Sequence, residues 1–586
     1  MVWVKEKRDF ISVLTRLFRG AGRFLRRPGV VVVFFVAVNL LPNVLLCFTE
    51  PLSGLGKGIL VVGPAGVYLV LFSLNRRVGV MPLWLSPLWV FHAFQLVLLY
   101  LYGESVIAVD MFLNLPTTNA SEAGELLGSI WPAVGMVGML YLLAIVLAVV
   151  AVWGKWSCSA RCQRWMMGVG IGLLVASGVG IVAEKERDAR YAMRNAVYPV
   201  NVLYNLGYAI QKWQRSEAYP ETSASFTFQA IREGSPGRRE IYVLVIGEAA
   251  RAGNWSLWGY ERETNPELKR VENLVIYKDA LTQSNTTHKS VPLILSAADA
   301  EHYERLYGSK SVLTAFKEVG FKTLFLSNQI PNRSFTDYFA AEADVHVVIR
   351  TSSEGGLVTY NNYDGVLVPL VKYYADSLAD EDLFIVLHTY GSHFNYKERY
   401  PPKFARFQPD AVMDIEYKNK AHLVNAYDNS VLYSDYFLAR LIDTLRRMET
   451  ESVLIYSSDH GEDLWDDERR KFLHASPVPT YYQLHIPLFI WFSPAYKEWQ
   501  PVRYEEAVRH ASLPVATNVI FHTLLDLARV RTPYWDSTLS VVHPGFKQRP
   551  RMYLNDHDQP INYYKVGLKW QDTAMIKRLG LDHSLE

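Results

Sequence analysis

The sequence predicts a protein of two parts, a membrane domain of five helices followed by an exported domain of the layered α/β class. A chain of 586 residues is too long for one ordinary hydrophobic core. Most long apolar runs lie before about residue 183, whereas the rest has ordinary globular composition. From about residue 240 onward, apolar runs that suit strands alternate with amphipathic segments that suit helices. This alternation is typical of α/β proteins.

Five apolar stretches have roughly the 17 to 25 residues that a helix needs to cross a bilayer. They cover residues 29–48, 59–75, 82–102, 128–153 and 165–183. Neighbouring helices can accommodate the prolines in the second and third stretches. The alternative is a soluble protein in which these segments are buried core helices, but five in series favour a membrane domain.

The basic residues predict how the chain is oriented in the membrane. Eight Lys and Arg residues lie within residues 1–27, and the connections at 76–77 and 155–164 are also basic. The loop 103–127 contains neither Lys nor Arg. The amino terminus is therefore expected in the cytoplasm, and five spans place the chain after about residue 184 outside it. No convincing cleavage site follows the first stretch, so we interpret it as a retained helix.

We expect three segments: a transmembrane domain at 1–183, a juxtamembrane linker with an interfacial helix at 184–239, and a catalytic domain at 240–586. The three cysteines, Cys47, Cys158 and Cys162, all precede the exported domain, which therefore has no disulfide. The formal net charge of +2 does not suggest a nucleic-acid-binding protein. The last 40 residues carry no pattern that predicts a role.

Polar residues follow the predicted strands directly. The apolar run 241–246 ends at Glu248, and the run 452–456 ends at Asp459 and His460. Open parallel sheets bind their ligands at the carboxyl ends of the strands, so these side chains are expected to converge. Two carboxylates and an imidazole suit a divalent metal. Taken singly, Glu248 could instead cap a helix, and the Asp459 segment could be a polar turn.

Thr287 lies in a polar segment ahead of Ser290-Val-Pro. A threonine hydroxyl needs activation to act as a nucleophile, which a dication or a helix N-terminus supplies. Ordinary helix capping by Thr286, Thr287 or Ser290 is the alternative. His393 and His474 are isolated histidines that carry no functional signal when each is taken alone.

Together, five segments in order resemble the bacterial phosphoethanolamine transferases, which include lipid A and lipopolysaccharide-core modifying enzymes and the mobile colistin-resistance enzymes. They are residues 245–251, 259–266, 287–292, 391–394 and 458–462. The resemblance implies five membrane helices and a periplasmic α/β/α domain of the alkaline-phosphatase (sulfatase) type. It also implies a multi-pass protein of the bacterial inner membrane.

The resemblance further implies the metal site and the nucleophile. A zinc ion is expected to be held by Glu248, Thr287, Asp459 and His460, with Thr287 as the attacking group. Manganese remains an alternative to zinc.

Five more residues match family positions that contact substrate. His393 and His474 match histidines that contact the transferred phosphate or a second zinc. Asn114, Thr118 and Glu122 recur every four residues, which places them on one helix face. They match a trio that lines the ethanolamine end of the lipid donor, and Glu122 is expected to pair with the ammonium group.

The reaction implied is transfer of phosphoethanolamine from phosphatidylethanolamine to an envelope acceptor through a phosphoethanolamine-threonine intermediate. The cysteine-free exported domain favours the branch that acts on lipopolysaccharide core sugars or periplasmic glucans over the disulfide-rich lipid A branch. Ala249 replaces a frequent Ser or Thr, which should be tolerable because that position is not a ligand. The alternatives are a phosphoglycerol transferase similar to lipoteichoic acid synthase, a lipid A or glucan acceptor, and a sulfatase or phosphatase.

Overall fold

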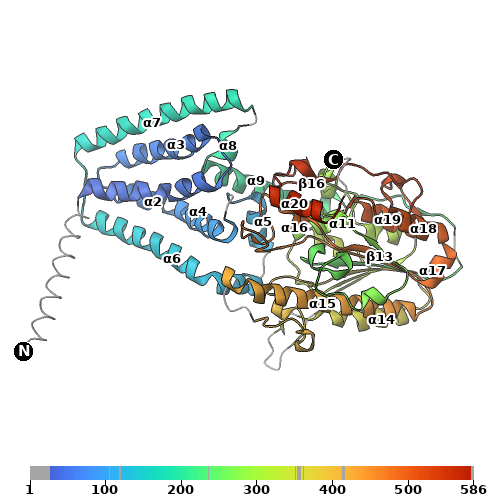
Figure 1. Ribbon diagram of the computed structural model, residues 1–586. Coiled ribbons are helices and arrows are strands. Elements are labelled where there is room, and N and C mark those ends of the chain that lie inside the picture. The colour runs from blue at the N-terminus through green and yellow to red at the C-terminus, as the bar shows by residue number, and fades with distance from the viewer. Residues whose placement is uncertain are drawn as a thin grey trace, which may run out of the picture. The chain divides into compact units, whose positions relative to one another are not determined.

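The computed structural model describes residues 27–581 apart from 104–105, 118–119, 190, 235–236, 350, 353–357, 360–361 and 412–415. The chain forms two compact units (Figure 1). The first contains residues up to Ala108 together with Ile130–Tyr208, and the second contains Val109–Ser129 together with Ala209–Glu586. Residues 109–129, which lie within the expected transmembrane segment 1–183, therefore belong to the second unit. The first unit ends at Tyr208, inside the expected linker 184–239.

The described residues include five helices that are long and apolar enough to cross a membrane, and they lie in the first unit except for the start of the fourth. They are α2 (Pro28–Thr49), α3 (Gly54–Ser73), α4 (Val80–Tyr102), α6 (Ala120–Trp153) and α7 (Ala160–Arg187). The prediction of five such helices is confirmed. The last two extend beyond the apolar stretches because polar turns continue them; at α7, the Ser159 hydroxyl accepts a hydrogen bond from the Cys162 amide at 3.2 Å.

Small residues let α3 and α7 pack closely. A Cβ atom on Gly66 of α3 would lie 2.9 Å from the carbonyl oxygen of Gly170 on α7. Side chains at these two positions would push the backbones apart, and close backbone approach is what gives apolar helices their packing contacts in a membrane.

Short elements connect the long helices to the central sheet of the second unit. They are α5 (Val109–Thr117), α8 (Met193–Ala196), α9 (Val200–Glu217), α10 (Tyr219–Thr222) and β1 (Ile231–Arg232). Helix α9 forms where the sequence predicts a helix in the juxtamembrane segment.

The second unit is built on a seven-stranded sheet with the order β3-β13-β10-β2-β9-β5-β6. The strands are β2 (Glu240–Gly247), β3 (Leu274–Tyr277), β5 (Lys322–Ser327), β6 (Val345–Val348), β9 (Leu383–His388), β10 (Glu451–Ser458) and β13 (Leu488–Phe492). All pairs from β10 to β6 are parallel, as predicted, but β13 runs antiparallel to both its neighbours. The sheet is therefore mixed rather than wholly parallel.

Helices cover both faces of this sheet (Figure 1). In chain order they are α11 (Thr287–Leu295), α12 (Val312–Glu318), α13 (Phe335–Ala340), α14 (Leu367–Ser377), α15 (Lys420–Arg446), α16 (Tyr481–Leu484), α17 (Pro494–Trp499), α18 (Pro501–His510), α19 (Val519–Leu527) and α20 (Trp570–Arg578). Short strand pairs complete the unit: β4 (Ala280–Leu281) with β14 (Val515–Ala516), β7 (Thr351–Ser352) with β8 (Val358–Thr359), β11 (Asp463–Leu464) with β12 (Phe472–Leu473), β1 with β15 (Val530–Arg531), and β16 (Met552–Leu554) with β17 (Pro560–Asn562). The predicted α/β/α layering is confirmed.

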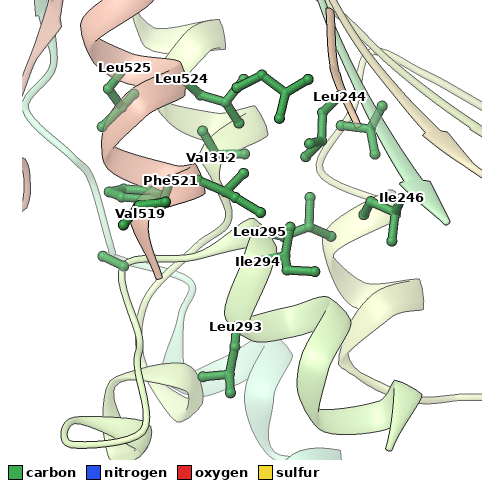
Figure 2. Packing of buried hydrophobic residues seen from close by; sticks show 14 of the residues in the cluster. Leu244, Ile246, Leu293, Ile294, Leu295, Val312, Val519, Phe521, Leu524 and Leu525 are labelled. Atoms are coloured by element: carbon green, nitrogen blue, oxygen red, sulfur yellow. The ribbon is translucent and has the colours of Figure 1, made fainter. Parts of the chain in front are cut away.

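The hydrophobic core fixes helix α11 against the sheet. Leu244 and Ile246 of β2 belong to one buried cluster with Leu293 to Leu295 of α11 and with Phe521 of α19 (Figure 2). Every residue of β2 is buried, because helices cover both of its faces. The helix that begins at Thr287 is thus held by apolar packing at its carboxyl-terminal end.

Candidate functional site

The ends of β2 and β10 bring three potential metal ligands together. Gly247 pairs in register with Ser458, so Glu248 and the Asp459-His460 pair leave the sheet at the same edge. One ligand atom from each of Glu248, Asp459 and His460 lies within 4.8 Å of the others, and all three residues are buried. The Nε2 atom of His460 is 3.5 Å from Glu248 Oε1 and 3.2 Å from Asp459 Oδ2.

The donor chemistry of this cluster fits zinc. The Nδ1 atom of His460 donates a hydrogen bond to the Gly461 carbonyl at 2.9 Å, which leaves the Nε2 lone pair directed at the two carboxylates. Burial lowers the pKa of His460 to about 4, so the ring is neutral near pH 7 and able to bind a metal. Two carboxylates and a neutral imidazole are ligands that zinc accepts.

Thr287 is the first residue of α11, and its hydroxyl completes the cluster. Its Oγ1 atom is 3.1 Å from His460 Nε2 and 3.3 Å from Glu248 Oε1. Thr286 is the N-cap residue; it is buried, and its hydroxyl contacts Ser284 Oγ at 3.2 Å. The cap of the helix and the hydroxyl at the metal cluster are therefore two different residues.

A second group of contacts orients the carboxylates. The Gln329 side-chain amide donates to Glu248 Oε2 at 3.0 Å and to the Thr389 carbonyl at 2.7 Å. Asp459 Oδ1 accepts the amides of Ala249 and His460 at 3.1 and 2.7 Å. The sequence analysis missed Gln329. The rule that ligands lie at the carboxyl ends of strands could have found it, because Gln329 lies just beyond the end of β5.

Backbone geometry at this edge requires small residues. Ala249 has φ of 54°, a left-handed conformation, and is fully buried, so its amide rather than its side chain serves the site. A Cβ on Gly391, which has φ of 52°, would lie 2.6 Å from the Glu248 carbonyl oxygen. Gly391 thus allows the loop after β9 to approach Glu248.

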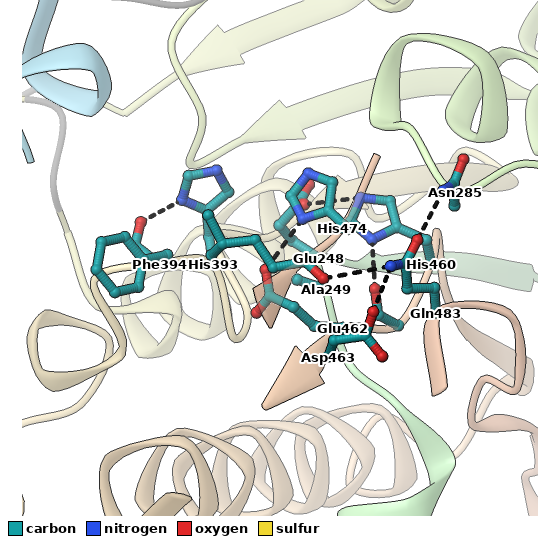
Figure 3. Close-up of polar contacts among 12 residues, drawn as sticks. Glu248, Ala249, Asn285, His393, Phe394, His460, Glu462, Asp463, His474 and Gln483 are labelled. Atoms are coloured by element: carbon teal, nitrogen blue, oxygen red, sulfur yellow. Dashed lines mark hydrogen bonds and ion pairs between the residues drawn. The ribbon is translucent and has the colours of Figure 1, made fainter. Parts of the chain in front are cut away.

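The remaining predicted histidines lie beside the cluster (Figure 3). The His474 ring centroid is 4.0 Å from that of His460 and 6.5 Å from that of His393. His474 Nδ1 is 3.0 Å from Glu462 Oε1, and His393 Nδ1 is 2.5 Å from the Phe394 carbonyl oxygen. Burial is the main cause that lowers the pKa of His393 to about 3 and that of His474 to about 4, so both rings are neutral near pH 7.

The predicted donor-binding trio is only partly described. Asn114 lies on α5 and is half-buried. Thr118 lies outside the described residues, between the end of α5 at Thr117 and the start of α6 at Ala120, and the side chain of Glu122 also lies outside them. A cavity of about 90 Å³ is lined by Leu113 of α5 and by His288, the residue after Thr287.

The chain is similar to a known family model, to curated proteins and to solved structures. Residues 240–530 match the model of the family described as Sulfatase. The chain is 30% identical over 316 residues to phosphoethanolamine transferase EptA of Salmonella typhimurium strain LT2, which is 52% of this chain and 56% of that protein. The zinc complex of the periplasmic domain of Escherichia coli EptC is 26% identical with a TM-score of 0.53, over 60% of this chain and 98% of that one. The chain is thus similar in sequence and in fold to phosphoethanolamine transferases.

The similarity of fold also extends to the membrane helices. The chain shares its fold with the integral membrane protein EptA of Neisseria meningitidis, with a TM-score of 0.67 at 22% identity over 87% of this chain and 98% of that one. The chain spans about half the length of the curated relatives it matches. The resemblance seen in the five sequence segments is confirmed by these relatives.

Proposed function

We propose that this protein transfers phosphoethanolamine from phosphatidylethanolamine to a lipopolysaccharide core sugar through a covalent intermediate on Thr287. The observation that carries the proposal is the position of the Thr287 hydroxyl, 3.1 Å from His460 Nε2 and 3.3 Å from Glu248 Oε1. A hydroxyl used only for capping has no reason to face a buried cluster of metal-ligating groups. The family relationship supplies the chemistry of the group transferred.

Glu248, Thr287, Asp459 and His460 would hold zinc, which is the metal in the related EptC complex. When bound, zinc supplies positive charge that favours an ionised hydroxyl and offsets the charge on phosphoryl oxygens. Gln329 and the amide of Ala249 keep the two carboxylates in place. The manganese alternative has no comparable support.

In the first half of the reaction, Thr287 Oγ1 attacks the donor phosphorus, and the bond from phosphorus to the diacylglycerol oxygen breaks. The proton of the Thr287 hydroxyl ends on the departing diacylglycerol. The phosphoryl group then lies at the N-terminus of α11, where backbone N–H groups and the helix dipole favour an anion. The product of this step is phosphoethanolamine esterified to Thr287.

In the second half, an acceptor hydroxyl attacks the phosphorus and Thr287 leaves, recovering a proton. His393 and His474 are the candidates for removing the acceptor proton. Each uses Nδ1 for a contact within the protein, with Phe394 O and Glu462 Oε1 respectively. Because a carbonyl oxygen only accepts, His393 Nδ1 is the donor, which leaves Nε2 of that neutral ring to accept a proton.

The membrane helices support the proposed donor and location. Asn114, Thr118 and Glu122 would bind the ethanolamine end of the donor. We place the protein in the bacterial inner membrane, with its amino terminus in the cytoplasm and its catalytic domain in the periplasm. The five apolar helices support the use of a membrane lipid as donor. A core sugar is the proposed acceptor because the exported domain lacks the cysteines of the lipid A branch.

The test is mass spectrometry of lipopolysaccharide core, lipid A and periplasmic glucans from cells with and without the gene. Phosphoethanolamine on the core, lost with the gene, is the expected result. Modification of lipid A or glucans alone would overturn the acceptor. A phosphoglycerol addition, together with use of phosphatidylglycerol by the purified protein, would overturn the donor and favour the phosphoglycerol transferase alternative.

A further inference from the structure

We propose that Asp110, Lys289 and Asp556 form a tether that positions α5, which carries the expected donor residue Asn114, against the helix that begins at Thr287. The proposal rests on the proposed function for what α5 binds. The contacts of the tether do not depend on that function, and all of them lie within the second unit.

The first half of the tether joins α5 to the carboxyl-terminal hairpin of β16 and β17. The Asp556 carboxylate accepts the backbone amides of Val109 and Asp110, each at 2.8 Å. These are the first two residues of α5, whose amides have no partner within the helix. A carboxylate at that end also interacts favourably with the helix dipole. A helix of nine residues is too short to be stable alone, so α5 depends on such contacts.

The second half joins α5 to α11. Asp110 Oδ2 is 2.7 Å from Lys289 Nζ, and Asp110 Oδ1 is 3.3 Å from His288 Nε2. Lys289 is fully buried and lies two residues after Thr287. Its ammonium group is also 3.2 Å from Asp558 Oδ1 and donates to the Asn555 carbonyl at 2.9 Å. Asp110 therefore binds two consecutive residues that directly follow the proposed nucleophile.

The same hairpin also supports the segment that leads into α11. The Tyr553 hydroxyl donates to Asn285 Oδ1 at 2.7 Å, and the Leu554 amide donates to the Gln283 carbonyl at 2.8 Å. Asn555 orders the turn by accepting the amide of Gln559 at 2.8 Å. The hairpin thus contacts both α5 and the approach to Thr287, which gives the carboxyl-terminal segment a role that its sequence does not reveal.

The consequence concerns alignment of the donor. Asn114 follows Asp110 by four residues, so the two lie on the same face of α5. Leu113 and His288 line one cavity, so the end of α5 lies close to α11. Because α5 carries the residue expected to bind the donor, a small shift of α5 would misplace the donor site and weaken donor binding, which raises the Michaelis constant more than it lowers the turnover number. Asp110, Lys289 and Asp556 are positioning residues in this scheme.

The test compares Asp556→Ala and Asp556→Asn with the wild type as full-length protein in phosphatidylethanolamine-containing nanodiscs. Asp435→Ala is the matched control, because Asp435 is also buried and accepts two backbone amides, those of Glu267 and Leu268 at 2.9 and 3.0 Å. Amide hydrogen exchange of residues 106–117 reports the tether directly. The Michaelis constant and turnover number for phosphatidylethanolamine report its effect on the donor.

For Asp556→Ala we expect exchange at Val109 and Asp110 to become at least about tenfold faster and the Michaelis constant to rise about tenfold, as for loss of a charge-assisted hydrogen bond. The turnover number should change less. Asp556→Asn should lie in between, because its amide oxygen can still accept one N–H. Asp435→Ala should alter neither quantity.

Unchanged exchange in Asp556→Ala would overturn the tether. Faster exchange with an unchanged Michaelis constant would overturn its role in donor positioning, as would an equal rise in Asp435→Ala. Should Asp556→Ala not fold, Asp556→Asn decides by the same criteria. If the wild type does not use phosphatidylethanolamine, the proposed function fails, and the exchange data still decide whether the tether exists.

Discussion

The hydroxyl of Thr287 lies 3.1 Å from Nε2 of His460, although 173 positions separate the two residues in the sequence. The contact depends on two independent features of the fold. Register between β2 and β10 sets His460 beside Glu248, and apolar packing of α11 sets Thr287 above them. The sheet thus positions the metal ligands and helix α11 positions the nucleophile. Substitutions in the sheet and in the helix can therefore be tested separately.

The amide of Gln329 is predicted to hold Glu248 in its ligand orientation. Gln329→Ala removes the hydrogen bond to Glu248 Oε2 without removing a ligand. We expect zinc affinity to fall roughly 10- to 100-fold, the usual effect of losing a group that orients a ligand. Competition with a zinc chelator measures this change. Gln571→Ala, at a half-buried glutamine whose side-chain amide donates to Glu468, is the control. Equal affinity in Gln329→Ala and the control would show that Glu248 needs no such support.

Stability is predicted to depend on pH through Asp435, a buried residue of α15. Burial raises the pKa of its carboxyl group to about 7, whereas an unfolded chain has a value of about 3.9. The folded state therefore penalises ionisation, so the group's contribution to stability is greatest below about pH 4 and falls as the pH rises through about 7.

The comparison of wild type with Asp435→Asn isolates this contribution, because Asn cannot ionise. Thermal unfolding of the full-length protein in detergent at pH 5 and pH 8 is the measurement. The wild type should lose more stability than Asp435→Asn between these values. If the difference in unfolding temperature between wild type and Asp435→Asn is the same at pH 5 and pH 8, Asp435 does not titrate in this range.

The orientation in the membrane is predicted from the basic loops. A reporter that works only outside the cytoplasm should be active when fused after residue 239 and inactive within the loop 154–159. The reason is that Lys and Arg are retained on the cytoplasmic side. Reporter activity in the opposite pattern would place the metal cluster in the cytoplasm and remove the envelope acceptor from the proposal.

The fold was predictable where one segment carries its own signal. The run 241–246 is continuously apolar because both faces of β2 are covered, and membrane helices are recognised by their length and apolar composition. The direction of β13 was not predictable, because an apolar run such as 488–492 has the same composition whether it runs parallel or antiparallel to its neighbours.

The candidate site also contains residues that the sequence predicts and residues that it does not. Glu248, Asp459 and His460 could be found because each directly follows a buried strand. The tether could not, because Asp110 meets Lys289 across 179 positions and Asp556 across 446. No local pattern marks a carboxylate as the cap of a distant helix. Such residues become visible only when the packing of the chain is known.

The nucleophile itself gives the sharpest prediction. Thr287→Ala should abolish transfer while zinc content and membrane insertion remain, because Glu248, Asp459 and His460 still provide three ligands. Thr287→Ser keeps a hydroxyl at the same place and should retain part of the activity. Thr286→Ala is the matched control, since the Thr286 side chain makes no cap hydrogen bond and contacts Ser284 Oγ at 3.2 Å.

Wild-type protein incubated with phosphatidylethanolamine and no acceptor should gain a phosphoethanolamine adduct on the peptide containing Thr287. Mass spectrometry with fragmentation locates the modified residue. The adduct should disappear in Thr287→Ala and persist in Thr286→Ala, because only Thr287 Oγ1 reaches both His460 and Glu248 among these hydroxyls in the described structure. An adduct on Thr286 or Ser284, or an active Thr287→Ala protein, would assign the nucleophile to another group and leave the metal cluster to be explained without it.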